Sequence, residues 1–266
     1  MIIVQRSGHT TKWSYSERSK RSNNEVVKIK IMEEELKILI RHISRYIFPT
    51  AFMANADHEQ VAVRGSLGVI LSSFVDNAPQ IMDLFNKELP ELKRLILTDL
   101  EAIQRNDPAV ESEKEVIFCY PGLKEMIYYR TAHILYQLGV PVLPRFITEQ
   151  AHSITGIDIH PAAQIGEQFC IDHGTGIVIG ATAIIGKGVT LYQGVTLGAK
   201  NFQHDAQGQP LDVPRHPILE DNVTVYSNTS ILGRVRIGEG SVIGGNVWLT
   251  HDVPAGVKLL KDRPLG

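Results

Sequence analysis

Two polar side chains, Asp158 and His173, stand fifteen residues apart in a stretch otherwise rich in aliphatic residues and glycine. A carboxylate that contacts one nitrogen of an imidazole fixes the tautomer and raises the basicity of the other nitrogen. If the fold joins the two side chains, His173 becomes a general base for a hydroxyl or amine nucleophile near neutral pH. The alternative is structural, with His173 a surface turn residue and Asp158 a turn cap. The spacing by itself leaves both interpretations open.

The surrounding segment repeats every six residues between Ile159 and Leu249. A six-residue repeat is typical of a parallel β-helix, in which three hexads close one triangular coil and stacked coils share a core. In the second half the large aliphatic positions are Leu219, Val225, Ile231, Ile237, Ile243 and Leu249. In the first half they are Ile159, Ile165, Ile171 and Ile177, and after a shift of two they are Ile179, Ile185, Leu191 and Leu197.

The register of this β-helix follows from its period. Three hexads predict that residue i lies beside residue i+18 of the next coil, at the ordinary strand spacing of ~4.8 Å. Ile159 should then pair with Ile177, and Leu219 with Ile237. The spacing of fifteen positions from the aspartate to the histidine is a little less than one coil, which predicts that the two side chains lie on neighbouring coils within reach of each other.

The repeat is interrupted once, between Leu197 and Leu219, where polar and turn-forming residues replace the hexads. This pattern predicts a loop extruded from the wall of the prism. The loop ends in the sequence Arg215-His216-Pro217, which offers two cationic or hydrogen-bonding side chains. Long loops on a rigid scaffold serve binding more often than packing, so we expect this loop to border a site.

The part of the chain before the hexads has a different pattern. Residues 31–150 show apolar spacings of three and four, which predict helices broken near Pro49, Pro108 and Pro121. The first 30 residues lack this period and carry seven lysines and arginines, so residues 1–30 are predicted to form a flexible basic arm. The predicted fold is α+β, with helices over 31–150, a β-helix over 151–256 and a short tail over 257–266.

The composition of the chain excludes some classes of partner. The 266 residues carry a formal net charge of −2, which argues against nucleic acid because such a partner calls for a clustered basic face. No apolar stretch reaches the ~18 residues of a membrane span, and the first residues lack a signal-peptide core. We therefore expect a soluble, cytoplasmic protein without a membrane partner. Cys119 and Cys170 show no metal or redox spacing and are expected to be reduced thiols.

Several motifs together resemble the serine O-acetyltransferases of the hexapeptide acyltransferase superfamily. The resemblance covers residues from about 80 to 256. The motifs are Asp-Pro-Ala from Asp107, Tyr-Pro-Gly from Tyr120, Asp-Ile-His-Pro-Ala-Ala from Asp158, Asp-His-Gly-Thr-Gly from Asp172, Gln-Gly-Val-Thr-Leu-Gly from Gln193, and Arg-His-Pro from Arg215. Hexads alone indicate only the superfamily. The Asp-His step, the Arg-His-Pro loop and the Asp-Pro-Ala segment are specific to the family.

The resemblance implies a fold, a reaction and a catalytic pair. The β-helix should be left-handed, and the protein should transfer acetyl from acetyl-CoA to the hydroxyl of L-serine, the first step of cysteine biosynthesis. His173 would be the general base and Asp158 would orient it. The substrate contacts would be Asp107 and Asp172 for the ammonium, Arg215 for the carboxylate, and His216. No metal is expected.

The resemblance also implies where CoA lies and how chains assemble. CoA would occupy a groove between two subunits, bordered by Gly198, Ala199, Lys200 and Ser227. Here the chain departs from the family, with Ala181 for a usual Glu, Ser227 for an Ala and Val242 for a frequent Lys. Homotrimers are expected, and the helical part would join two trimers. The chain ends at Gly266 and not in the isoleucine-ended tail that binds O-acetylserine sulfhydrylase in relatives, so that complex is not expected.

Three other classes compete with this interpretation. A sugar or xenobiotic acetyltransferase on the same scaffold would use one histidine but would not need the aspartates and arginine that fit a zwitterion. A carbonic-anhydrase-like β-helix would need three histidines on one metal, yet His160, His173, His204, His216 and His251 show no coil spacing that stacks ligands. A non-catalytic scaffold would tolerate loss of His173.

Overall fold

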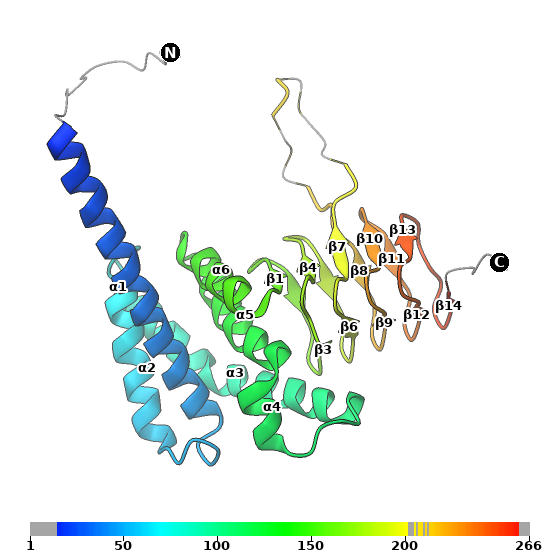
Figure 1. Cartoon of the computed structure of the whole chain (residues 1–266), viewed down its shortest axis with the longest axis horizontal. Helices are drawn as coiled ribbons and strands as arrows, with labels where there is room; N and C mark the ends of the chain where they lie inside the picture. The colour runs from blue at the N-terminus through cyan, green and yellow to red at the C-terminus, as the bar shows by residue number, and fades with distance from the viewer. Residues whose placement is uncertain (1–14, 202–204, 206, 210, 212, 261–266) are drawn as a thin grey trace.

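The computed structural model describes residues 15–201, 205, 207–209, 211 and 213–260, with side chains described from Lys30 onward. Within these residues, six helices precede a β-helix of fourteen short strands, and Figure 1 shows the two parts side by side. The helices are α1 (Tyr15–Ile47), α2 (Ala56–Leu71), α3 (Ala78–Asn106), α4 (Glu113–Cys119), α5 (Pro121–Gln137) and α6 (Leu143–Thr155). Among the described residues, no helix has the length and apolar character needed to cross a membrane.

The described part of the β-helix has three faces, and each face is a sheet of parallel strands. Sheet A contains β1 (Asp158–Ile159), β4 (Val178–Ile179), β7 (Thr196–Gly198), β10 (Ser230–Leu232) and β13 (Trp248–Leu249). Sheet B contains β2 (Gln164–Ile165), β5 (Ile184–Ile185), β8 (Ile218–Leu219) and β11 (Arg236–Ile237). Sheet C contains β3 (Cys170–Asp172), β6 (Thr190–Tyr192), β9 (Thr224–Val225), β12 (Val242–Ile243) and β14 (Lys258–Leu259). The chain visits A, B and C in turn, so about five coils stack along one axis.

The hexad positions form the interior of this prism, as the sequence predicted. Ile159, Ile177, Leu197 and Ile237 are almost fully buried, and burial of one such side chain stabilises the fold by about 1.5–3 kcal/mol. Leu219 pairs with Ile237, which confirms the i+18 register in that half. The left-handed winding stays a prediction.

The register prediction is wrong in the first coil. Ile159 pairs with Ile179, twenty residues on, and not with Ile177. Five residues separate β3 from β4, whereas three separate β6 from β7, so the corner that follows β3 holds two extra residues. The extra residues lie in the segment 173–177 that contains His173, and the stack returns to its eighteen-residue period once they are passed.

Three predicted boundaries also differ from the structure. Residues 15–30, assigned to a flexible arm, belong to α1, whereas residues 1–14 lie outside the described part of the chain. The absence of apolar periodicity misled the prediction, because lysine, arginine and glutamate are good helix formers even without a buried face. The helices continue past residue 150 to Thr155. Strand β14 pairs Lys258 with Val242, so the β-helix extends beyond residue 256 into the predicted tail.

The helices are fastened to the first coil by polar contacts. Arg130 on α5 donates two hydrogen bonds to buried Asp99 on α3, at 2.7 and 2.9 Å, and a third to the carbonyl of Gly166 at 2.7 Å. The hydroxyl of Tyr129 donates to the carbonyl of Ala163 at 2.6 Å. These contacts fix α3 and α5 relative to the coil that carries the predicted catalytic histidine, and both helices contact its strand β3.

Candidate active site

His173 occupies the corner where sheet C turns into sheet A. Its φ of 57° lies in the left-handed region, as do the φ values of Gly174 and Gly176 in the same corner. The same conformation recurs at other turns of the β-helix, at Gln168, Asn222, Asn228 and Asn246, so it belongs to the corners of the coils and does not by itself mark a site. The extra residues of this corner leave 72% of the His173 side chain exposed, so the imidazole is accessible to a substrate.

Two aspartates lie close to this imidazole. Asp172, the last residue of β3, places Oδ1 3.9 Å from Nδ1 of His173. Asp107 caps the C-terminus of α3, where its Oδ2 accepts a hydrogen bond from the Tyr120 hydroxyl at 2.6 Å. Its Oδ1 accepts one from the backbone N–H of Ala109 at 2.8 Å. These hydrogen bonds, Tyr120 foremost, lower the pKa of Asp107, and the nearby His173 lowers it further. Negative charge is thereby gathered beside the imidazole.

The cap of α3 is held against sheet C. The amide of Asn106 donates to the Thr190 hydroxyl on β6 at 3.3 Å. The contact spans 84 residues of sequence, so it joins the helical part to the second coil. Asp107 is the residue after Asn106. Asp172 lies on β3, the strand of sheet C next to β6, where it pairs with Tyr192. The structure therefore brings together three of the predicted site residues, Asp107, Asp172 and His173.

Asp158 does not join them. Its Oδ1 accepts a hydrogen bond from Nη1 of Arg145 on α6 at 3.2 Å, and the same guanidinium pairs with Glu149. No hydrogen bond or ion pair between Asp158 and His173 occurs within the described parts of the chain, so the predicted pair is not formed in this structure. The physical reason is that α6 lies against β1 and brings a cation to the carboxylate. The acidic partner of His173 in this structure is Asp172.

Arg215 and His216 lie at a different corner, between sheets A and B. They end the extruded loop, immediately before β8. The imidazole of His216 is almost fully buried, and this burial, followed by the neighbouring Arg215, lowers its pKa to about 4. A cavity of ≈ 520 Å³ opens beside it, lined by Thr182, Arg215 and Arg234 among others. This corner therefore carries positive charge, whereas the corner of His173 carries negative charge.

The predicted CoA residues are divided between the same two corners. Gly198, Ala199 and Lys200 leave the end of β7 at the corner of sheets A and B, where the Gly198 carbonyl accepts from the N–H of Gly233 at 3.0 Å. Ser227 follows β9, at the corner of sheets C and A. The predicted site residues thus lie along both edges of sheet A.

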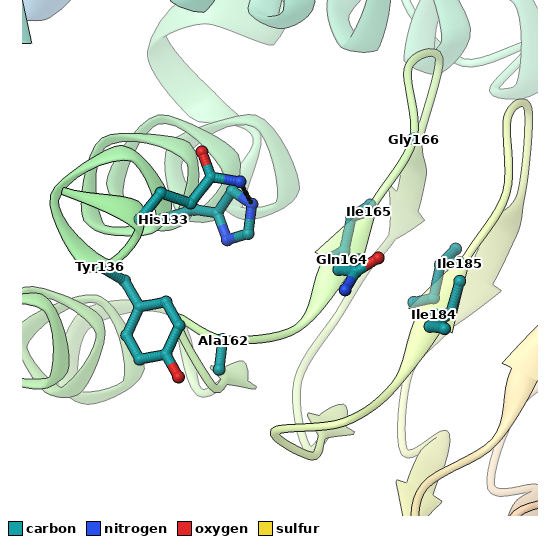
Figure 2. Close-up of a pocket in the computed structure, with 9 residues that line it drawn as sticks. His133, Tyr136, Ala162, Gln164, Ile165, Gly166, Ile184 and Ile185 are labelled. Carbon is teal, nitrogen blue, oxygen red and sulfur yellow. Dashed lines mark hydrogen bonds between the residues drawn. The ribbon is translucent and has the colours of Figure 1, made fainter. Parts of the chain in front are cut away.

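A second cavity, of ≈ 450 Å³, adjoins the positive corner. Figure 2 shows His133 and Tyr136 on α5 facing Gln164 and Ile184 on strands β2 and β5. Nδ1 of His133 lies 2.7 Å from the Pro161 carbonyl, to which it can only donate. Tyr136, Gln164 and Ile184 also line the cavity beside Arg215, so the two cavities adjoin along sheet B.

Sequence reasoning missed four residues that form hydrogen bonds with predicted site residues. Tyr120, in the Tyr-Pro-Gly motif, was recognised as a family feature but not as the hydrogen-bond donor to an aspartate. Arg145, Thr182 and Arg234 carried no signal, because each reaches its partner through the tertiary fold and not through a sequence pattern. Their contacts become visible only from the packing of α6 on the β-helix and from the stacking of the coils.

Comparison with known proteins gives consistent results. The family model described as bacterial transferase hexapeptide (six repeats) matches residues 216–251. The plasmid serine acetyltransferase of Synechococcus elongatus is 52% identical over 181 residues, which cover 68% of this chain and 57% of that protein. The serine acetyltransferase of Helicobacter pylori is 40% identical over 157 residues, 59% of this chain and 87% of that protein.

A solved structure agrees with these sequence matches over more of the chain. The crystal structure of Entamoeba histolytica serine acetyltransferase 1 in complex with L-cysteine superposes with a TM-score of 0.77 at 36% identity, covering 84% of this chain and 86% of that chain. The matched stretch spans only 57% and 63% of two Synechococcus elongatus relatives. With the coverage of the Helicobacter and Entamoeba proteins, the β-helix and its helical part place the chain in the serine acetyltransferase family.

Proposed function

We propose that the protein is a serine O-acetyltransferase that transfers acetyl from acetyl-CoA to the hydroxyl of L-serine. The observation that carries the proposal is the cluster of an exposed His173 with Asp172 and Asp107 in a member of this family. Serine is a small zwitterion, and the two carboxylates suit its ammonium group. The imidazole beside them suits its hydroxyl, because a neutral histidine accepts a proton near neutral pH.

In the proposed reaction the serine oxygen attacks the thioester carbonyl as His173 takes the hydroxyl proton. The tetrahedral intermediate then collapses, the carbon–sulfur bond breaks, and the imidazolium returns the proton to the departing CoA thiolate. Asp172, 3.9 Å from Nδ1, stabilises the imidazolium between these steps. No covalent enzyme intermediate is needed, because both substrates are held side by side.

We propose that the complete site forms between copies of the chain. His173 lies at one edge of sheet A, whereas Arg215 lies at the other. A cyclic arrangement brings one edge of each chain against the opposite edge of the next, which is a heterologous contact that closes into a ring. Arg215 of one protomer would then meet the serine carboxylate while His173 of its neighbour receives the hydroxyl proton. A trimer is the assembly expected from the family.

The helical part supports a further level of assembly, a dimer of trimers. An apolar groove of ≈ 300 Å³ runs between α1, α4 and α5, and is lined by Phe48, Phe52 and Phe118 among others. Phe118 is about half exposed, at 48%, which is high for a large aromatic side chain. Sedimentation of the full chain tests both levels, and a stable monomer would overturn them.

The experiment that tests the activity measures release of free CoA thiol from acetyl-CoA. L-Serine, L-homoserine, L-threonine and a galactoside are compared as acceptors, for the intact protein and for His173→Ala. Serine-dependent release that is lost in the variant is expected. Release with a different acceptor alone would exclude serine, and equal release by the variant would exclude His173 as the base.

L-Cysteine supplies a second arm of the same experiment. The Entamoeba histolytica relative was crystallised in complex with it. Cysteine has the same ammonium and carboxylate as serine, so we expect it to raise the apparent KM for serine without a matching fall in kcat.

A further inference from the structure

Thr182 forms the centre of a hydrogen-bond network at the base of the Arg-His-Pro loop. It lies between β4 and β5, one coil away from the loop. Its hydroxyl oxygen accepts from the backbone N–H of Arg215 at 2.9 Å and from that of His216 at 3.1 Å. Its own backbone N–H donates to Nδ1 of His216 at 3.1 Å. One side chain thus contacts both predicted substrate-binding residues of this corner.

The network determines where the imidazole carries its hydrogen. The Thr182 hydroxyl also lies 2.8 Å from Nδ1 of His216. Both lone pairs of that hydroxyl are used by the two backbone N–H groups, so its single hydrogen is available for Nδ1. Nδ1 then accepts two hydrogen bonds and cannot carry a hydrogen of its own. The ring hydrogen of His216 must therefore be on Nε2.

A guanidinium closes the network from the next coil. Nη1 of Arg234 donates to the carbonyl of Thr182 at 2.6 Å and to the carbonyl of His216 at 3.0 Å. The ring of His216 is also seated against Gly180, where an added Cβ would lie 2.1 Å from Nε2. The imidazole is thus held by backbone packing on one side and by hydrogen bonds on the other.

The surrounding charges favour the same neutral form. Burial lowers the pKa of His216 most, and the nearby Arg215 on the loop, His160 after β1 and Arg234 after β10 lower it further. No acidic side chain in the described part of the chain raises this pKa. A proton added at Nδ1 would point at two hydrogen-bond donors and would lie among cations.

We infer that Thr182 and Arg234 are positioning residues that hold His216 as a permanent neutral Nε2–H donor for an acceptor oxygen of the substrate. This inference rests on the proposed function, in which that oxygen belongs to the carboxylate of the amino acid. His216 is then neither a base nor a cation. Arg215 supplies the charge at this corner, and His216 supplies a directed hydrogen bond, which discriminates against acceptors that lack the carboxylate.

The first test reads the tautomer directly and needs no turnover. Imidazole 15N spectra of the full-length protein are recorded from pH 5 to pH 8, with His216→Asn identifying the resonances of His216. Wild type and Thr182→Ser, which keeps the hydroxyl, are expected to show an Nε2–H tautomer that does not titrate. In Thr182→Val the resonances should shift or begin to titrate. A wild-type His216 that titrates in this range, or that carries hydrogen on Nδ1, would overturn the inference.

The second test separates the two substrates. Thr182→Val is expected to raise the KM for serine ~10-fold, equivalent to ~1.4 kcal/mol, and to leave the KM for acetyl-CoA unchanged. Arg234→Met should act in the same direction, with Thr182→Ser close to wild type. An equal loss toward both substrates would indicate a merely structural role. If serine is not a substrate, the proposed function fails while the spectra still decide the tautomer.

Discussion

Glu125 is a buried acid whose proton should make the stability of this protein depend on pH. Its side chain, on α5, has no exposed surface, and Oε1 has no hydrogen-bond partner among the described residues. Oε2 lies 2.8 Å from the hydroxyl of Thr155, which lies equally close to the carbonyl of Ala151. One hydroxyl hydrogen cannot serve both acceptors. A proton on Oε2 resolves this conflict, because the acid then donates to Thr155 and Thr155 donates to the carbonyl.

The magnitude follows from the pKa. Burial raises the pKa of Glu125 from 4.5 to about 8. Between these values the folded protein keeps a proton that the unfolded chain has released, so the free energy of unfolding falls as the pH rises. Each pH unit costs about 1.4 kcal/mol, which gives a loss of ~3 to 4 kcal/mol between pH 5 and pH 8. Glu125→Gln, a neutral isostere, should not suffer this loss.

The assay is urea denaturation at fixed protein concentration, performed at pH 5, 6, 7 and 8. Wild type and Glu125→Gln should be similar at pH 5, and the variant should be the more stable by ~3 kcal/mol at pH 8. Glu101→Gln, which changes an exposed glutamate on α3, is the matched control and should follow wild type. Parallel pH curves for wild type and Glu125→Gln would refute the argument that the acid is neutral when folded.

Three further predictions concern the core and the site. Asp99→Ala should lower the free energy of unfolding by ~3–5 kcal/mol, because it leaves the buried Arg130 guanidinium without its carboxylate. Tyr120→Phe removes the main hydrogen bond that lowers the pKa of Asp107, so the titration of the Asp107 carboxyl, followed by its 13C chemical shift, should move to higher pH. Gly180→Ala should raise the KM for serine ~10-fold, because the new methyl group displaces the imidazole of the Arg-His-Pro loop.

The Asp99 and Gly180 variants each have a matched control. Asp83→Ala breaks an exposed ion pair with Arg64 and should cost under ~1 kcal/mol in the same denaturation assay. Gly65→Ala, where nothing lies within 4 Å of the added Cβ, tests whether any glycine replacement impairs activity. A Tyr120→Phe titration curve of Asp107 that coincides with wild type would mean that the Tyr120 hydrogen bond does not lower the pKa of Asp107. Equal losses in the two glycine variants would contradict the steric argument.

The β-helix was predictable because its period is a local property. A large aliphatic residue every sixth position can be buried only if the chain closes three faces, and Leu219 and Ile237 meet as that rule requires. The rule failed where the chain carries extra residues, so Ile159 pairs with Ile179. The shift of the large aliphatic positions by two residues was visible in the sequence. Only the stacked coils show that the extra residues lie at the corner of His173.

Part of the site was predictable, and there is a physical reason why some of its contacts were found and others were missed. Family motifs identified Asp107, Asp172 and His173, which the fold brings together. The expected partner Asp158 is instead bound by Arg145, because an ion pair depends on which helix covers the strand and no spacing encodes that packing. Thr182 escaped notice for the same reason, since its contacts cross 33 and 34 residues of sequence. The roles of all these residues in binding stay predictions.

The stacked coils allow the length of the β-helix to vary independently of the predicted site residues. Every predicted site residue precedes β10, so the coils from β10 to β14 carry none of the reacting groups. Whole coils added at that end would lengthen the prism in steps of ~4.8 Å, the strand spacing, without moving His173 or its aspartates. The length of this prism and the placement of its predicted site residues can therefore change separately.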